Sequence, residues 1–295
     1  MLTPDAHNRL TSLNKGKLKH LDEKRGGNPS GTAASRPNDA VHEPALRIHA
    51  GSVIPIPIEK AVPGQITKED DGEFLLIKRR MKDICEDAGV LHDLFTGAVR
   101  ITQNSASLNG TVSGSLIRPE KILFLDIETC GLTANPLFLI GVAYFSSSDF
   151  ILLQMFARDY DEERPLLSFF SRFIAGYDLI VTYNGRSFDL PFIRTRAYEN
   201  RIHLNTEKQH LDLLFEVRRL WKAELPDCKL QTVEQHILEQ TRSGDIPGSE
   251  IPRVYHDYVQ TRNIAAVQTI LKHNILDVVS LIRIIILTAG KHKAE

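Results

Sequence analysis

Short apolar runs of strand length follow one another between residues 121 and 157. The runs are "KILFLDIE", "LFLIGVAYF" and "FILLQMFA", and turn-bearing loops join them. Runs of this length in quick succession predict an antiparallel meander of three strands. A fourth run, "YDLIVTYN", is continuous in Leu, Ile and Val. This pattern is typical of a strand that is buried on both faces.

Helical patterns precede and follow the fourth strand. "DEERPLLSFFSRFIAG" has acids in its first turn and Gly176 at its end, as helices often do. Later patterns predict helices at 188–201, 212–222, 229–240, 251–260 and about 263–289. Meander strands, a helix, a further strand and more helices together predict an α/β fold, with a mixed sheet and helices on both faces.

The first 117 residues show weaker patterns. Residues 1–45 are polar, rich in Gly, Ser and Pro and without apolar periodicity, so we expect a disordered tail. We expect a small accessory segment and linker at 46–117, before a main domain at 118–290. Within this segment a helical period is approached by Phe74, Leu75, Ile77, Met81 and Ile84. "QNSASLNGTVSGS" (103–115) has the composition of a linker.

Composition excludes several classes of protein. With 36 basic and 37 acidic residues, the chain has no global positive field, so any contact with nucleic acid must be local. Three scattered cysteines predict reduced thiols and a cytoplasmic location. The start lacks the pattern of an export signal. The most apolar window, 278–289, is shorter than the ~20 residues of a membrane span and contains Arg283, which predicts a buried helix and no membrane contact.

Two acids follow the first apolar run directly. Asp126 and Glu128 are two residues apart, so on a continuing strand they share one face. Two carboxylates at one buried spot repel one another unless a cation is present. Oxygen ligands of this kind suit Mg²⁺ or Mn²⁺. Alternatively, the strand ends at Leu125 and both acids are solvated turn residues.

A third acid comes just after the fourth strand. Asp189, in "VTYNGRSFDLPFI", lies in the first turn of a predicted helix. Ligands often bind at such strand ends in open sheets. The alternative is an acid that only complements the helix dipole. Asn184 could orient a loop or a catalytic neighbour, and Phe188 has core packing as its alternative role.

A histidine and an acid stand four residues apart in the last predicted helix. His273 and Asp277 therefore lie one above the other, among residues so apolar that the helix must be largely buried. Charged groups are rarely buried without a partner. A structural Asp–His pair is the alternative. All three segments can meet at one edge of the sheet, which would form the ligand set for two divalent ions.

Three segments resemble a known superfamily. "FLDIET", "YNGRSFDLPFI" and "HNILDVVSL", in that order and spacing, resemble the motifs of the DEDD superfamily of RNase H-like 3′ to 5′ exonucleases. Residues 118–289 more closely resemble the bacterial YprB-like ribonuclease H-like domain proteins. Further phrases carry this second resemblance: "RDYDEERPLL", "DLLFEVRRLWKAELPDCKLQTVEQHIL" and "DIPGSEIPRVYHDYVQTRN".

The resemblance implies an RNase H-like mixed sheet and a two-metal exonuclease. Two Mg²⁺ or Mn²⁺ ions would be held by Asp126, Glu128, Asp189 and Asp277. The resemblance leaves two roles for His273, namely accepting a proton from the attacking water or orienting that water. Its spacing matches the tyrosine of proofreading enzymes, whereas RNase T-type enzymes have His five residues before the Asp. Cys130 stands where many relatives have Thr.

The implied partner is nucleic acid, as a single strand or a 3′ end. Expected substrate contacts are Thr129, Cys130, Gly131, Leu132, Asn184 and Phe188. DNA and RNA both stay open as substrates. A structure-selective endonuclease and a catalytically weak binding module are the alternative functions on the same scaffold.

Overall fold

The computed structural model describes residues 57–104, 117–132, 135–146, 148–205 and 207–292. The disordered tail expected at 1–45 lies outside the described residues, as does most of the linker expected at 103–115.

Within these described ranges, seven strands form one mixed sheet in the order β1-β2-β5-β4-β3-β6-β7. The strands are β1 (Gly64–Glu69), β2 (Gly72–Arg80), β3 (Ile122–Thr129), β4 (Leu137–Ser146), β5 (Asp149–Phe156), β6 (Leu179–Thr182) and β7 (Gln209–Asp212). The predicted meander is confirmed, because β3, β4 and β5 pair antiparallel. β6 pairs parallel with both β3 and β7. The sequence patterns do not predict β1 or β7.

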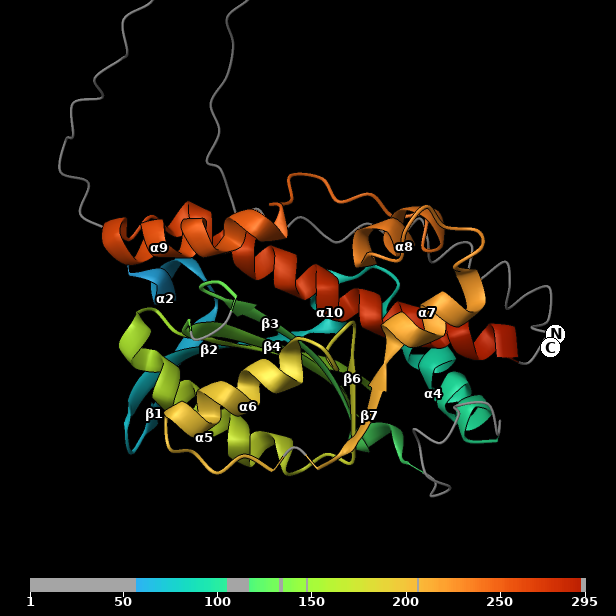
Figure 1. Ribbon diagram of the computed structural model, residues 1–295, viewed down its shortest axis with the longest axis horizontal. Helices are drawn as coiled ribbons and strands as arrows, with labels where there is room; N and C mark the ends of the chain where they lie inside the picture. Colours follow the sequence, from blue (N-terminus) through green and yellow to red (C-terminus); the bar gives the residue numbers. More distant parts are fainter. Residues whose placement is uncertain (1–56, 105–116, 133–134, 147, 206, 293–295) are drawn as a thin grey trace, which may run out of the picture.

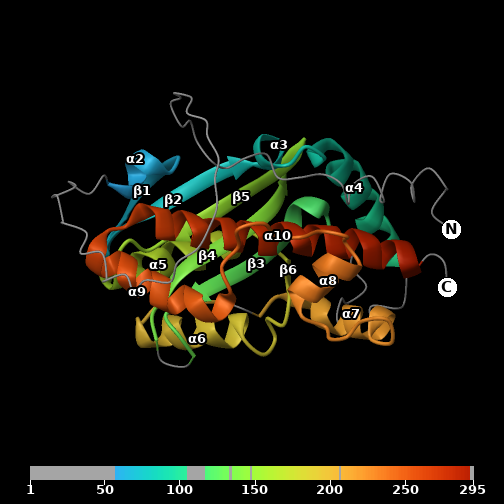
Figure 2. The ribbon, with the colours of Figure 1, turned by 90° about the horizontal axis from the view of Figure 1, so that it is seen from above.

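Helices cover both faces of this sheet. The α-helices are α2 (Ile58–Ala61), α3 (Met81–Ile84), α4 (Ala88–Asn104), α5 (Glu163–Ile174), α6 (Asp189–Glu199), α7 (Leu213–Trp221), α8 (Leu230–His236), α9 (Ile251–Thr261) and α10 (Ile264–His292). Short 3-10 helices are found at Pro119–Lys121, Tyr160–Glu162 and Gly248–Glu250. Figure 1 shows α5 and α6 on one side of the sheet and α8, α9 and α10 on the other. In Figure 2, α10 crosses obliquely over the strands.

The prediction of a helix through Phe74, Leu75 and Ile77 is wrong. These residues form β2, and helix begins only with the short α3 at Met81. β2 pairs antiparallel with β1 on one side and with β5 on the other. Backbone hydrogen bonds to two neighbouring strands outweigh a helical pattern that rested on a few apolar positions.

The accessory segment expected at 46–117 adds β1 and β2 to the same sheet as the later strands. Its helix α4 packs against α10. A buried ion pair joins the two regions, with Arg283 Nη2 of α10 3.0 Å from Asp87 Oδ2, just before α4. The apolar helix that contains Arg283 is therefore buried, as expected. The boundaries of folding domains stay a prediction.

The strand β3 divides its side chains between two hydrophobic clusters. Leu123, Leu125 and Ile127 belong to one cluster, which includes residues of α5 and α6. Ile122 and Phe124 belong to the other, which includes most of the buried apolar residues of α10. Since strand side chains alternate, the even-numbered acids that follow Phe124 take the α10 face.

Candidate active site

The predicted site residues lie at the carboxyl ends of two neighbouring parallel strands. Asp126 and Glu128 are in the last half of β3, and Asp189 is the first residue of α6, after β6. β3 and β6 are hydrogen-bonded in parallel register. α10 contacts β3 and supplies His273 and Asp277 from the covered face. The fold thus brings the three sequence segments to one edge of the sheet.

A row of residues across the sheet places Asp126 against α10. Asp126 is in register with Gly141 of β4, which is in register with Gln154 of β5. Asn274 of α10 is fully buried over this row. Its Nδ2 donates to Asp126 Oδ2 at 2.8 Å, and its Oδ1 accepts from Gln154 Nε2 at 2.9 Å. A Cβ at position 141 would lie 2.0 Å from Asn274 Oδ1, so glycine is what allows this approach.

Glu128, His273 and Asp277 form the tightest cluster of potential metal ligands in the described part of the chain. One ligand atom from each lies within 4.8 Å of the others. His273 Nε2 is 3.5 Å from Asp277 Oδ2, as the four-residue spacing predicts. Asp126 and Asp189 are outside this trio, which therefore differs from the set of four carboxylates that the resemblance implies.

Asp189 is held by the loop that leads into α6. The loop residue Asn184 has a left-handed φ of 63°, and its amide N–H donates to Asp212 Oδ1 at 2.7 Å. The amide of Arg186 donates to Asp212 Oδ2 at 3.0 Å. Asp212 also caps α7 by accepting from the amide of Leu214 at 3.1 Å. One buried carboxylate therefore connects the end of β7, the start of α7 and the loop before Asp189.

Burial and mutual repulsion make the acid cluster unstable when fully ionised. Burial raises the pKa of Glu128 to about 8 and that of Asp189 to about 7. Burial and the charges of Asp277 and Glu128 raise the pKa of Asp126 well above its ordinary value. A divalent cation would reverse these shifts, because it favours the ionised carboxylates. The donor set, mostly carboxylate oxygens, fits Mg²⁺ or Mn²⁺.

Residues that the sequence analysis missed complete the polar cluster. The loop between α8 and α9 brings in Arg242, which donates to both carboxylate oxygens of Glu234 at 2.6 Å and to Asp245 Oδ2 at 3.0 Å. Arg242 also donates to Asp277 Oδ1. Burial would lower the pKa of Arg242, but the Glu234 hydrogen bonds and the Asp277 charge raise it, so the guanidinium stays charged.

Sequence signals for these missed residues differ. Asn274 is a polar residue in a strongly apolar helix beside His273, which is a usable signal of a buried partner. Arg242 and Asp245 lie in an irregular loop whose composition indicates only a turn region. Nothing in the spacing of that loop points to α10.

The expected substrate contacts lie in two loops at the same edge. Leu132, in the loop after β3, is 78% exposed although it is apolar. Thr129, the last residue of β3, is buried and donates its hydroxyl to the Gly131 carbonyl, while Cys130 is partly buried. Asn184 is exposed and Phe188 is partly buried, and both precede α6. Their contact with substrate stays a prediction.

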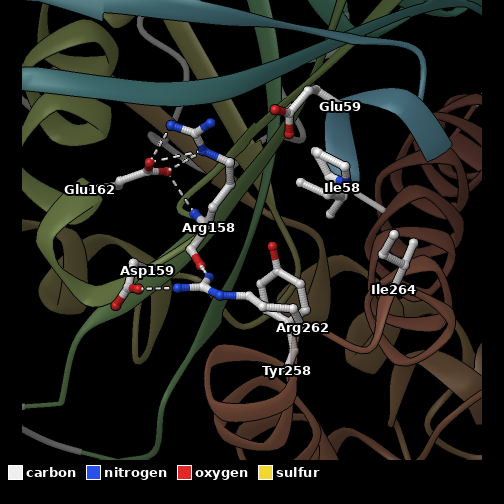
Figure 3. Close-up of a pocket in the computed structure, with 9 residues that line it drawn as sticks. Ile58, Glu59, Arg158, Asp159, Glu162, Tyr258, Arg262 and Ile264 are labelled. Carbon is white, nitrogen blue, oxygen red and sulfur yellow. Dashed lines mark hydrogen bonds and ion pairs between the residues drawn. The ribbon is translucent and has the colours of Figure 1, made fainter. Parts of the chain in front are cut away.

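A separate surface cavity, shown in Figure 3, contains none of the predicted site residues. It has a volume of about 320 Å³ and lies between α2, α9 and the start of α10. Its two arginines are already paired. Arg158 donates to Glu162, and Arg262 donates to Asp159. Because each cation has a carboxylate partner, this cavity is a weaker candidate than the acid cluster.

A family model described as the RNase_H superfamily matches residues 123–288. The chain belongs to this superfamily. It is also 32% identical over 199 residues to the uncharacterized protein YprB of Bacillus subtilis strain 168. That alignment covers 65% of the chain and 48% of YprB, so the chain matches about half the length of this relative. The expected RNase H-like α/β fold and the resemblance to YprB are confirmed.

Among solved structures, the chain is similar to the family B DNA polymerase from the hyperthermophilic archaeon Pyrobaculum calidifontis. The TM-score is 0.46 at 19% identity, and the match covers 56% of this chain and 24% of the polymerase chain.

The described residues contain no helix that is both long and apolar enough to span a bilayer.

Proposed function

We propose that this RNase_H superfamily chain is a metal-dependent nuclease that removes nucleotides from the 3′ end of a single strand. The observation that carries the proposal is the convergence of Asp126, Glu128, Asp189 and the His273–Asp277 pair, from three distant segments, at one sheet edge. A solvated-turn role for the acids does not account for their raised pKa values, which arise mainly from burial.

The carboxylates of Asp126, Glu128, Asp189 and Asp277 would hold the divalent ions. Bound ions of this kind supply an acidified water and stabilise charge on the leaving oxygen. The chain's own contribution is to position these carboxylates on rigid elements and to hold a proton acceptor beside them. His273 Nε2 faces Asp277 and is the group placed to take a proton from the attacking water.

The first experiment asks how the chain cleaves. Single-stranded DNA and RNA, labelled at either end, are incubated with the protein and Mn²⁺ or Mg²⁺. We expect a 5′-labelled strand to shorten stepwise and a 3′-labelled strand to release labelled mononucleotide. Internal cuts would instead support the endonuclease, and binding without cleavage would support the binding module. Comparing DNA with RNA in the same panel identifies the preferred sugar.

The site assignment is tested with Asp126→Asn, which keeps the side-chain shape but removes the charge. We expect cleavage to fall below detection while the circular dichroism spectrum is unchanged. The matched control is Asp257→Asn on α9, an acid whose side chain is 53% exposed and forms an ion pair with Arg253. Full activity in Asp126→Asn would contradict the assignment.

A further inference from the structure

The loop between α8 and α9 reaches the candidate site through two side chains. Arg242 and Asp245 are three residues apart, and Gly244 between them has a left-handed φ of 64°. Both side chains are buried, with 8% and 9% exposed, and they bond to each other. Two buried charges in an irregular loop need partners from the surrounding elements, because a buried charge without a partner is costly in free energy.

Asp245 contacts the ring of His273 directly. His273 Nδ1 lies 2.9 Å from Asp245 Oδ1 and 3.0 Å from Asp245 Oδ2. An ionised carboxylate only accepts hydrogen bonds, so this short contact favours a proton on Nδ1 over the longer approach of Arg242 Nη1, at 3.5 Å. In the neutral ring, Nε2 then carries the lone pair, and it is Nε2 that lies beside Asp277.

Resting on the proposed function, we propose that Asp245 is a positioning residue. Its carboxylate holds the His273 ring through Nδ1 and so directs Nε2 toward Asp277 and Glu128, the acids that would hold the metal ions. Without Asp245 the ring is free to rotate or to carry its proton on Nε2, where it could not accept another.

Arg242 makes this arrangement rigid. Its guanidinium bonds to Asp245 and to Asp277, so it holds both the carboxylate behind the ring and the acid in front of it. Glu234 of α8 anchors the guanidinium from the other side and accepts from Ser280 of α10 at 2.5 Å. The hydrogen bonds of Arg242 and Glu234 therefore connect helix α8, the loop and α10 around His273.

The direct test is the ¹⁵N spectrum of the metal-free protein, recorded at a pH where the ring is neutral. The His273 signal is identified by its loss in His273→Gln. We expect protonated Nδ1 and unprotonated Nε2 in the wild type, and a shift toward the Nε2–H form in Asp245→Ala. A wild-type ring protonated on Nε2 would overturn the inference, and this result needs no folded variant of Asp245.

Kinetics give a second readout. We expect Asp245→Ala to lower kcat by roughly 10- to 100-fold, in the range seen when a residue behind a catalytic group is lost, with KM little changed. Asp245→Glu keeps a carboxylate and should recover part of the loss, whereas Asp257→Ala should match the wild type. Equal kcat in Asp245→Ala and the wild type would contradict the inference. If the wild type cleaves nothing, the proposed function fails, and the spectrum still tests the position of the ring.

Discussion

At the scale of single residues, Gly141 and Asn274 determine how closely α10 approaches the sheet. Asn274 contacts Asp126 only because Gly141 has no side chain. The alternation of β3 predicts which face Asp126 takes, but it does not reveal that a glycine on the neighbouring strand makes room for its partner. The hydrogen bond between Asn274 and Asp126 joins residues that are 148 positions apart in the sequence.

We expect Gly141→Ala to lower the free energy of unfolding by about 1–3 kcal/mol, because the added Cβ overlaps the Asn274 side chain. Urea unfolding measures this loss. The double variant with Asn274→Ala should recover part of it, since the obstructing amide is gone. As a control, Gly97→Ala places a methyl in open space on α4 and should stabilise by up to about 1 kcal/mol. An unchanged midpoint for Gly141→Ala would show that α10 can move away at no cost.

At the scale of elements, helices with strong patterns follow the sequence closely. The predicted helices at 251–260 and about 263–289 correspond to α9 and α10. The segment around Phe74 departs from its predicted helix. It forms the strand β2 through hydrogen bonds to β1 and β5, and the local sequence pattern does not reveal the pairing with β5. β7 is four residues long and begins with two polar residues, so its strand character comes from pairing with β6.

Asp212 connects several of these elements. We expect Asp212→Ala to lower the free energy of unfolding by roughly 2–4 kcal/mol, because it removes a helix cap and leaves the amides of Asn184 and Arg186 unpaired. Asp212→Asn keeps one acceptor oxygen and should lose less. Hydrogen exchange at the two amides should accelerate in Asp212→Ala. A stability equal to that of Asp257→Ala would mean that the loop does not depend on this carboxylate.

At the scale of the whole molecule, the acid cluster couples stability to pH and to metal. In the folded state the pKa values of Glu128 and Asp189 are raised to about 8 and about 7. The folded protein therefore holds protons that the unfolded chain releases above about pH 4. The contribution of these two groups to the free energy of unfolding is fully present below about pH 4. It decreases as pH rises above that value and is lost once pH has passed the folded pKa values of about 7 and about 8.

We expect the Tm of the metal-free protein to fall between pH 5 and pH 8.5. Mn²⁺ should offset this fall at the alkaline end. A ligand that binds only the folded state raises the free energy of unfolding by about 2.7 kcal/mol when its concentration is 100 times its Kd. Differential scanning calorimetry with and without Mn²⁺ measures both effects. Asp189→Asn should flatten the pH dependence. A Tm that rises with pH, or that does not change when Mn²⁺ is added, would contradict a binding site for a divalent cation.

The sequence by itself determined the local relations within the candidate site. Period-two alternation placed Asp126 and Glu128 on one face, and the four-residue helical spacing brought His273 beside Asp277, because both relations depend only on the geometry of one element. Only the tertiary structure decided that Arg242 and Asp245 reach this site. An irregular loop has no period from which its direction can be read, and its buried charges are stabilised only by the helices that surround it.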